Sequence, residues 1–124
     1  MNTPLFKKYN WAVSYKKVLN IGLEEVWKII SSPSNLELFH PFCAKNPVIQ
    51  WPGLHSIDEV HYYNGKVYKR NFILWEDFKG YDLLIGEIDG ETSLVSWKID
   101  DLGKDKSSLQ ITVYPHIFNT HSKI

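Results

Sequence analysis

Cysteine, excess charge of either sign and long hydrophobic runs are all scarce in this sequence of 124 residues. A single cysteine, Cys43, excludes an internal disulfide bond. Lysine plus arginine and aspartate plus glutamate number 14 each, so no basic excess exists to neutralise nucleic-acid phosphates or an anionic membrane surface. No apolar run approaches the ~18 residues of a membrane-spanning helix. We therefore expect no nucleic-acid partner and no membrane span.

The N-terminus lacks the features of a secretory signal. Its opening stretch, MNTPLFKKYNWAV, has no apolar core of about 7–15 residues and no small-residue cleavage site. Together with the lone cysteine, this predicts a cytoplasmic protein. The hydrophobic content of 44% suffices for one packed core, and the length predicts a single domain over residues 1–124.

Motifs for metal binding, phosphate binding and nucleophilic catalysis are missing as well. The sequence contains no HExxH, no Cys-x-x-Cys, no GxSxG and no glycine-rich phosphate loop. His40 and Cys43 are three residues apart, but Pro41 interrupts the helix that would align them. We predict no metal site and no cofactor.

What is present begins with a strand and two helices. A strand is expected over residues 11–19. The next segment carries apolar residues at positions i, i+3, i+4 and i+7 of an amphipathic helix, namely Leu23, Val26, Trp27 and Ile30. A second short helix is predicted over residues 34–39, and it must end near His40 because Pro41 disfavours a helical residue before it.

The remainder is typical of about six antiparallel strands. Asn64-Gly65 and Asp89-Gly90 are strong signals for two-residue hairpin turns, because both turn residues need a positive φ. The predicted strands cover residues 47–51, 58–63, 66–75, 81–88, 91–99 and 109–115.

Two-residue turns predict a register for these strands. They place Glu59 opposite Arg70 and Asp82 opposite Trp97, and a four-residue loop after Glu76 places Arg70 opposite Glu87. A charged ladder of Glu59, Arg70 and Glu87 is then expected on the outer face. The inner face is expected to carry Tyr62, Val67, Ile73, Trp75, Leu84, Ile88, Val95, Trp97 and Ile99.

Four apolar residues do not fit this assignment, and a bulge or a second covered surface would explain them: Phe72, Leu74, Leu83 and Ile85. The alternative is that the sheet is inside out. In that case Arg70, His61 and Tyr68 become the cavity residues, and Arg70 could hold a ligand carboxylate.

The β-α-α-β6 order resembles the START-like, or SRPBCC, superfamily, which includes polyketide cyclase/dehydrase-like and birch-pollen-allergen-like proteins. The resemblance covers residues 10–115 and is carried by VLNIGLEEVWKIISSPSNLELFHPF, DEVHYYNGKVY and LVSWKI. Ile21-Gly22 stands where the family often has Ala-Pro. The resemblance implies an α+β helix-grip fold, in which a curved antiparallel sheet wraps a long C-terminal helix and a hydrophobic cavity lies between them.

That helix is what should cover Leu109, Ile111 and Val113 on the last strand, and the sequence stops before it. The closing NTHSKI is too short to replace it. We therefore expect the face with Trp97, Ile111 and Val113 to be covered by another chain, as in a homodimer, by residues absent from this sequence, or by a bound apolar molecule.

The function that the resemblance implies is binding of a small hydrophobic or amphipathic molecule in the cavity. The alternatives are an enzyme of the polyketide cyclase/dehydratase type and a protein-interaction module that uses the open sheet face. Asp82 is a candidate general acid or base if it is buried, but no catalytic residue is assigned. The predicted ligand-binding residues are Phe39, Tyr62, Lys69, Asn71, Trp75, Asp82, Trp97, Val113 and His116.

Overall fold

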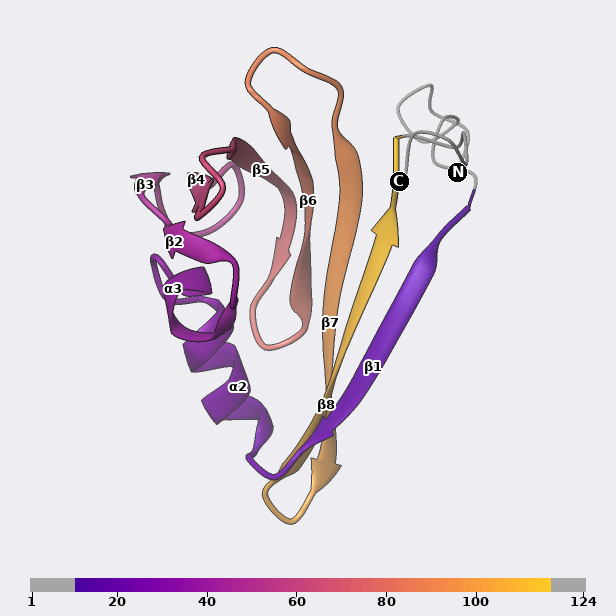
Figure 1. Ribbon diagram of the computed structural model, residues 1–124. Helices are drawn as coiled ribbons and strands as arrows, with labels where there is room; N and C mark the ends of the chain where they lie inside the picture. Colours follow the sequence, from indigo (N-terminus) through magenta and orange to yellow (C-terminus); the bar gives the residue numbers. More distant parts are fainter. Residues whose placement is uncertain (1–10, 117–124) are drawn as a thin grey trace.

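The computed structural model describes residues 11–116 as one eight-stranded antiparallel sheet with two short helices (Figure 1). The strand order is β1-β8-β7-β6-β5-β4-β2, and β3 pairs with β4. The strands are β1 Val13–Leu19, β2 Cys43–Lys45, β3 Val48–Gln50, β4 Ile57–Tyr62, β5 Val67–Glu76, β6 Gly80–Glu87, β7 Ser93–Gly103 and β8 Lys106–Tyr114. The helices are α2 Leu23–Ile30 and α3 Leu36–Phe39.

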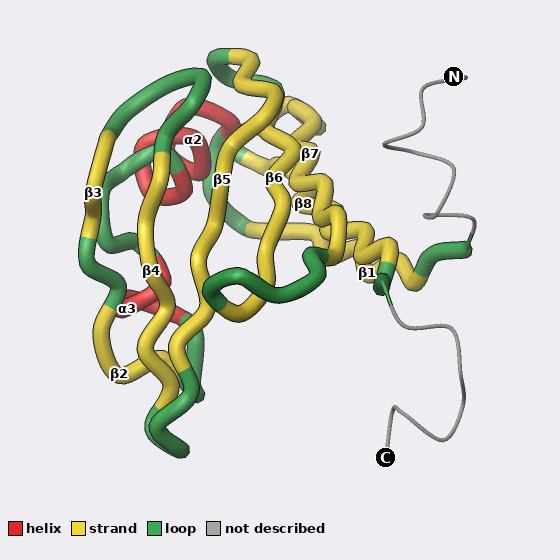
Figure 2. The backbone as a smooth tube through the Cα atoms, turned by 90° about the horizontal axis from the view of Figure 1, so that it is seen from above, coloured by secondary structure: helices red, strands yellow, loops and turns green. Residues whose placement is uncertain are grey.

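The sheet curves around both helices, which lie on its concave side (Figure 2). The predicted apolar stripe of α2 is buried at Val26, Trp27 and Ile30, so the helix closes the core against β7 and β8. Glu24 and Glu25 occupy the first turn of α2, where the positive end of the helix dipole favours acidic side chains.

The predicted order of elements is confirmed, and the short strand β2 was missed. The first helix, the end of α3 at His40 and both hairpin turns occur where the sequence placed them. The register is wrong by one residue. At Asn64-Gly65, the Gly65 N–H donates to the Tyr62 carbonyl at 3.0 Å, and Tyr62 N–H donates to Lys66 O at 2.9 Å. The loop therefore has one more residue than predicted, and Gly65 adopts a φ of 91° there.

The longer loop places Arg70 opposite Asp58 instead of Glu59. On its other side Arg70 pairs with Ile85 instead of Glu87. The second hairpin is shifted in the same way. The turn at Asp89-Gly90 is closed by a hydrogen bond from Gly90 N–H to Glu87 O, and Trp97 pairs with Tyr81 instead of Asp82. Because side chains alternate between faces, each one-residue shift exchanges the inner and outer sets of a strand.

The inner face consequently differs from the predicted one on β5 and β6, whereas on β4 Tyr62 faces inward as predicted. Val95, Trp97 and Ile99 are buried and Lys98 is exposed, as predicted for β7. Ile88 is exposed, and Leu84 lies on the outer face because it alternates with buried Leu83. Apart from glycines, the buried residues of β4 to β6 are Asp58, Val60, Arg70, Phe72, Tyr81 and Leu83.

A bulge between Phe72 and Leu74 explains why these two apolar residues broke the alternation on β5, whereas Leu83 and Ile85 face inward because the predicted face of β6 was wrong. The bulge brings Phe72 and Trp75 to the same face, where both pack on Tyr81 with ring centroids 4.9 and 5.3 Å away. Leu74 then points outward and is exposed. The centre of the core is thus a cluster of aromatic rings.

The edge formed by β1 and the far end of β8 extends beyond both helices (Figure 1). Val13 and Tyr15 on β1 are 57% and 65% exposed, beside Ile111 and Val113, which are half-buried. No helix follows β8 within residues 11–116, and the closing NTHSKI, which was judged too short to form the covering helix, falls outside the described residues. In this part of the chain no helix is long and apolar enough to cross a membrane.

Candidate functional site: an apolar pocket between α3 and the sheet

A pocket of about 340 Å³ lies between α3 and the concave face of the sheet. Helix α3 and the turn after it form one wall, and strands β4 to β8 form the other. Its lining is Leu36, Phe39, His40, Pro41, Tyr62, Arg70, Leu83, Ile85, Val95, Trp97 and Ile111. Most of these side chains are aliphatic or aromatic, which is the usual composition of a small-molecule site.

Aromatic rings form much of the wall. Phe39 lies with its ring centroid 6.1 Å from that of Trp97, and the His40 and Tyr62 rings are 5.8 Å apart in an edge-to-face arrangement. Phe39 is 44% exposed, so it stands at the rim, whereas Trp97 is buried at the base. A planar ligand entering past Phe39 would therefore meet a second aromatic surface at Trp97.

The charged pair Arg70 and Asp58 lies beneath this apolar lining. Arg70 Nε donates to Asp58 Oδ1 at 2.8 Å, and one terminal nitrogen donates to Asp58 Oδ2 at 2.6 Å. Their side chains are 2% and 0% exposed. The guanidinium also lies over the Phe72 ring, 4.9 Å from its centroid. This bidentate geometry satisfies both ions internally, as a buried ion pair requires.

Asn46 connects this pair to α3. Its Nδ2 donates to Asp58 Oδ2 at 2.9 Å, and its Oδ1 accepts a hydrogen bond from the Leu36 N–H at 3.1 Å. Its own backbone N–H donates to Glu37 Oε2 at 2.8 Å. The first turn of α3 is therefore fixed to β4, which holds the pocket wall in place.

His40 ends α3 and faces the pocket. Its Nδ1 accepts a hydrogen bond from the Phe42 N–H at 3.2 Å. Burial, helped by the nearby positive charge of Arg70 and opposed by a backbone hydrogen bond, holds the pKa of His40 below its usual 6.5. Burial likewise raises the pKa of the Tyr62 phenol. Both groups are therefore uncharged at neutral pH.

The structure brings three predicted ligand-binding residues into this pocket: Phe39, Tyr62 and Trp97. Trp75 packs instead within the aromatic core, 5.5 Å from Trp27 between ring centroids. Val113 lies in the same inner row as Val95 but does not line the pocket. His116 lies at the end of β8, where its Nδ1 is 2.8 Å from Ser93 Oγ.

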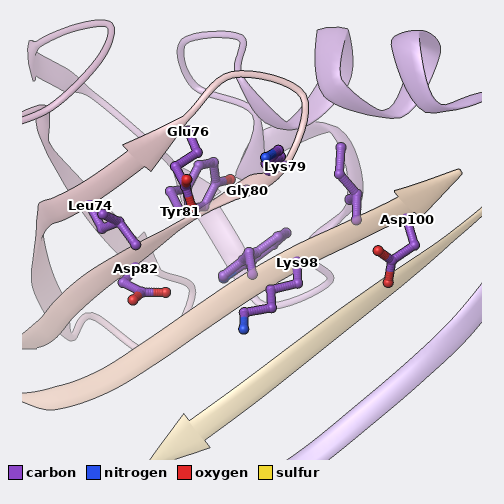
Figure 3. A pocket seen from close by; sticks show the side chains of 10 residues that line it. Leu74, Glu76, Lys79, Gly80, Tyr81, Asp82, Lys98 and Asp100 are labelled. Carbon is purple, nitrogen blue, oxygen red and sulfur yellow. The ribbon is translucent and has the colours of Figure 1, made fainter. Parts of the chain in front are cut away.

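The remaining three predicted residues, Lys69, Asn71 and Asp82, lie on the outer face because the predicted register was wrong. Asp82 borders a separate hollow of about 290 Å³ over β5, β6 and β7 (Figure 3). Asp82 and Lys98 alternate along their strands with buried Tyr81 and Trp97, so this hollow opens on the outer face. Its rim is charged and open to solvent, in contrast to the apolar pocket.

Most residues that line the pocket were not predicted from the sequence. The alternative in which the opposite face of the sheet lines the cavity did include some of them. Arg70 and Tyr68 do face inward, as that alternative required. His61 faces outward, where its Nε2 lies 2.8 Å from Glu59 Oε1. The sequence feature that could have identified His40 as a pocket residue was its position at the end of a predicted helix. Within residues 11–116 no three His, Cys, Asp or Glu side chains are grouped to hold a metal ion.

No protein-family model matches this sequence, and no curated protein matches it either. Solved structures do match. A point mutant of norcoclaurine synthase from Thalictrum flavum, in complex with a transition-state analogue, aligns with a TM-score of 0.71 and 18% identity over 92% of this chain and 80% of that one. Zhui aromatase/cyclase from Streptomyces sp. R1128 aligns with a TM-score of 0.73 and 10% identity over 92% and 73%.

A START superfamily protein from Mycobacterium smegmatis aligns with a TM-score of 0.69 and 14% identity, over 82% of this chain and 74% of that one. At such identities the likeness concerns the fold alone. The chain has the START-like, or SRPBCC, fold, an α+β arrangement in which a curved antiparallel sheet encloses helices. The expected fold class is confirmed.

Proposed function

We propose that this protein binds a small apolar or amphipathic organic molecule in the pocket between α3 and the sheet. The observation that carries the proposal is an apolar pocket walled by Phe39 and Trp97 on the concave face of the sheet. Its volume of about 340 Å³ is at the lower end of the ~300–1,000 Å³ typical of ligand sites, so a compact molecule of at most three rings fits best. The structural similarity to a synthase and to an aromatase/cyclase supports a ligand cavity of this kind.

Binding is better supported than the enzymatic alternative. An acid–base catalyst needs a titratable group free to exchange a proton with its substrate. The buried ions Arg70 and Asp58 are engaged in hydrogen bonds and are not free in this sense, which leaves His40 and Tyr62 on the pocket wall as the candidates for an enzymatic role. Binding needs only the apolar walls and a few polar groups that fix orientation.

The test is a fluorescence titration with N-phenyl-1-naphthylamine, a neutral dye whose emission rises in apolar surroundings. We expect saturable one-to-one binding, and Phe39→Ala should weaken it about tenfold, because an aromatic wall contributes roughly 1.5 kcal/mol. The matched control is Leu38→Ala. Leu38 is next in sequence and 70% exposed, but it does not line the pocket. Absence of binding, or equal affinity in both variants, contradicts the proposal.

We propose further that a second copy of the chain covers the open part of the concave face. The supporting observation is the exposure of Val13 and Tyr15 on β1, beside the half-buried Ile111. Tyr15→Lys should then lower the dimer fraction in sedimentation equilibrium at several concentrations. Val18→Lys is the control, because Val18 is also exposed but alternates to the opposite face of β1. A wild-type monomer at every concentration contradicts this proposal.

A further inference from the structure

The charges under the pocket cancel. Arg70 is the only lining residue of the pocket with a permanent charge, and two of its nitrogens are bonded to the Asp58 carboxylate. Both side chains are almost fully buried, so water cannot solvate the charged group of a ligand that is placed beside them. An anionic ligand would therefore lose its hydration shell, and Arg70, already paired with Asp58, would not compensate for that loss. This geometry disfavours the carboxylate-binding role that a lone buried arginine would have.

The position of the proton on His40 follows from its hydrogen bond. Nδ1 accepts from the Phe42 N–H, so in the neutral ring the proton resides on Nε2. No residue among 11–116 accepts a hydrogen bond from Nε2. The Tyr62 hydroxyl, whose ring packs against the imidazole, has no hydrogen-bond partner in the same part of the chain. The pocket wall thus offers one defined N–H donor and one adjacent hydroxyl.

We infer that the pocket selects an uncharged aromatic molecule of one or two rings whose carbonyl or ether oxygen accepts a hydrogen bond from His40 Nε2–H. The ring packs against Phe39 and Trp97, and the oxygen points to the wall formed by His40 and Tyr62. His40 is thereby the specificity-determining residue, and Asp58 excludes anions by neutralising Arg70. This inference rests on the proposed function.

Three naphthalenes of similar size test the selectivity by displacement of N-phenyl-1-naphthylamine at pH 7.5. They are 2-acetylnaphthalene, which is neutral with an acceptor; 2-isopropylnaphthalene, which is neutral without one; and 2-naphthoate, which is anionic. We expect the acetyl compound to bind about fivefold tighter than the isopropyl compound, the effect of one hydrogen bond. The naphthoate should bind weakest. Equal affinities, or tightest binding of the naphthoate, overturn the inference.

Two variants separate the roles of the two His40 nitrogens. An asparagine side-chain oxygen can replace Nδ1 as the acceptor for the Phe42 N–H but provides no donor at the position of Nε2. A glutamine amide reaches that position. His40→Asn should therefore abolish the preference for the acetyl compound, and His40→Gln should keep it. The control is His55→Asn, since His55 is exposed and outside the pocket and asparagine tolerates its φ of 70°. A preference that survives in His40→Asn contradicts the assignment.

Asp58→Asn tests the charge argument with little change of shape. It leaves Arg70 unneutralised, so 2-naphthoate should gain at least about tenfold in affinity relative to 2-acetylnaphthalene, the effect of a charged hydrogen bond. An unchanged ratio in the folded variant overturns the charge argument. If this variant does not fold, the ligand series on the wild type decides alone. Failure of the dye to bind refutes the proposed function itself, whereas binding without discrimination refutes only this inference.

Discussion

Arg70 donates two hydrogen bonds to Asp58, at 2.8 and 2.6 Å, and both side chains are buried directly beneath the apolar pocket. This pair joins β4 to β5 and, through Asn46, holds α3 over the sheet. Removing one partner leaves a buried charge without compensation, whereas removing both leaves an apolar site.

Asp58→Ala should therefore lower the free energy of unfolding by about 3–5 kcal/mol, as measured by urea denaturation. The double replacement Asp58→Leu with Arg70→Met should cost clearly less than the two single replacements together, because it leaves no unpaired ion. Additive losses would show that the two side chains act independently, which the bidentate geometry does not allow.

The register around this pair shows how far the sequence could lead. Asn64-Gly65 marked the turn correctly, but the dipeptide suits both a two-residue loop and a three-residue loop that ends in a left-handed glycine. One residue decides between Glu59 and Asp58 as the partner of Arg70. The choice depends on packing across the whole sheet, which local sequence does not encode.

The inner face of β7 was predicted correctly because Val95, Trp97 and Ile99 alternate cleanly with polar residues, although the strand runs to Gly103 instead of ending at residue 99. The bulge after Phe72 breaks the same period on β5, so the apolar residues there pointed to the wrong face. His40 could not be assigned to the site, since its proximity to Tyr62 comes from tertiary packing. The three predicted residues that line the pocket, Phe39, Tyr62 and Trp97, lie on α3, β4 and β7, and on both of these strands the predicted inner face is the observed one.

Tyr81 gives a second stability prediction. It is fully buried, its hydroxyl donates to Ile30 O at 2.9 Å, and burial raises its pKa strongly. Tyr81→Phe should cost only about 0.5–1.5 kcal/mol in urea denaturation, because Ile30 O still accepts a hydrogen bond from Asn35 Nδ2. The control Tyr15→Phe, on an exposed tyrosine, should change nothing measurable. A loss of 3 kcal/mol or more (roughly a cavity-sized effect) would contradict this description.

Cys43 should be unreactive in the folded protein. Burial and the negative charge of Glu37 raise the pKa of its thiol, and Sγ donates to Lys45 O at 3.3 Å. Only the thiolate reacts with Ellman's reagent, so we expect the folded protein to react at least about a hundredfold more slowly than the urea-unfolded chain at pH 8. Comparable rates in the two states would show that β2 opens freely.

His40 should make stability depend on pH below neutrality. Because its pKa in the folded protein is lower than the usual 6.5, the unfolded chain takes up the proton first as the pH falls. The contribution of neutral His40 is therefore complete above 6.5 and is lost as the pH falls from there toward the lower pKa of the folded state. Urea denaturation at pH 7.5 and 5.0 should show a smaller acid loss in His40→Asn than in the wild type. An identical acid loss in the two proteins would contradict this assignment.

The proposed ligand site lies between α3 and the sheet, against His40, Tyr62 and Trp97. The most direct measurement is an amide and indole chemical-shift titration of ¹⁵N-labelled protein with 2-acetylnaphthalene. We predict saturable shifts at His40, Tyr62, Arg70 and the Trp97 indole, with Asp82 and Lys98 on the outer face unaffected. Shifts confined to the outer hollow around Asp82 and Lys98, or no saturable shifts at all, would contradict this location of the ligand site.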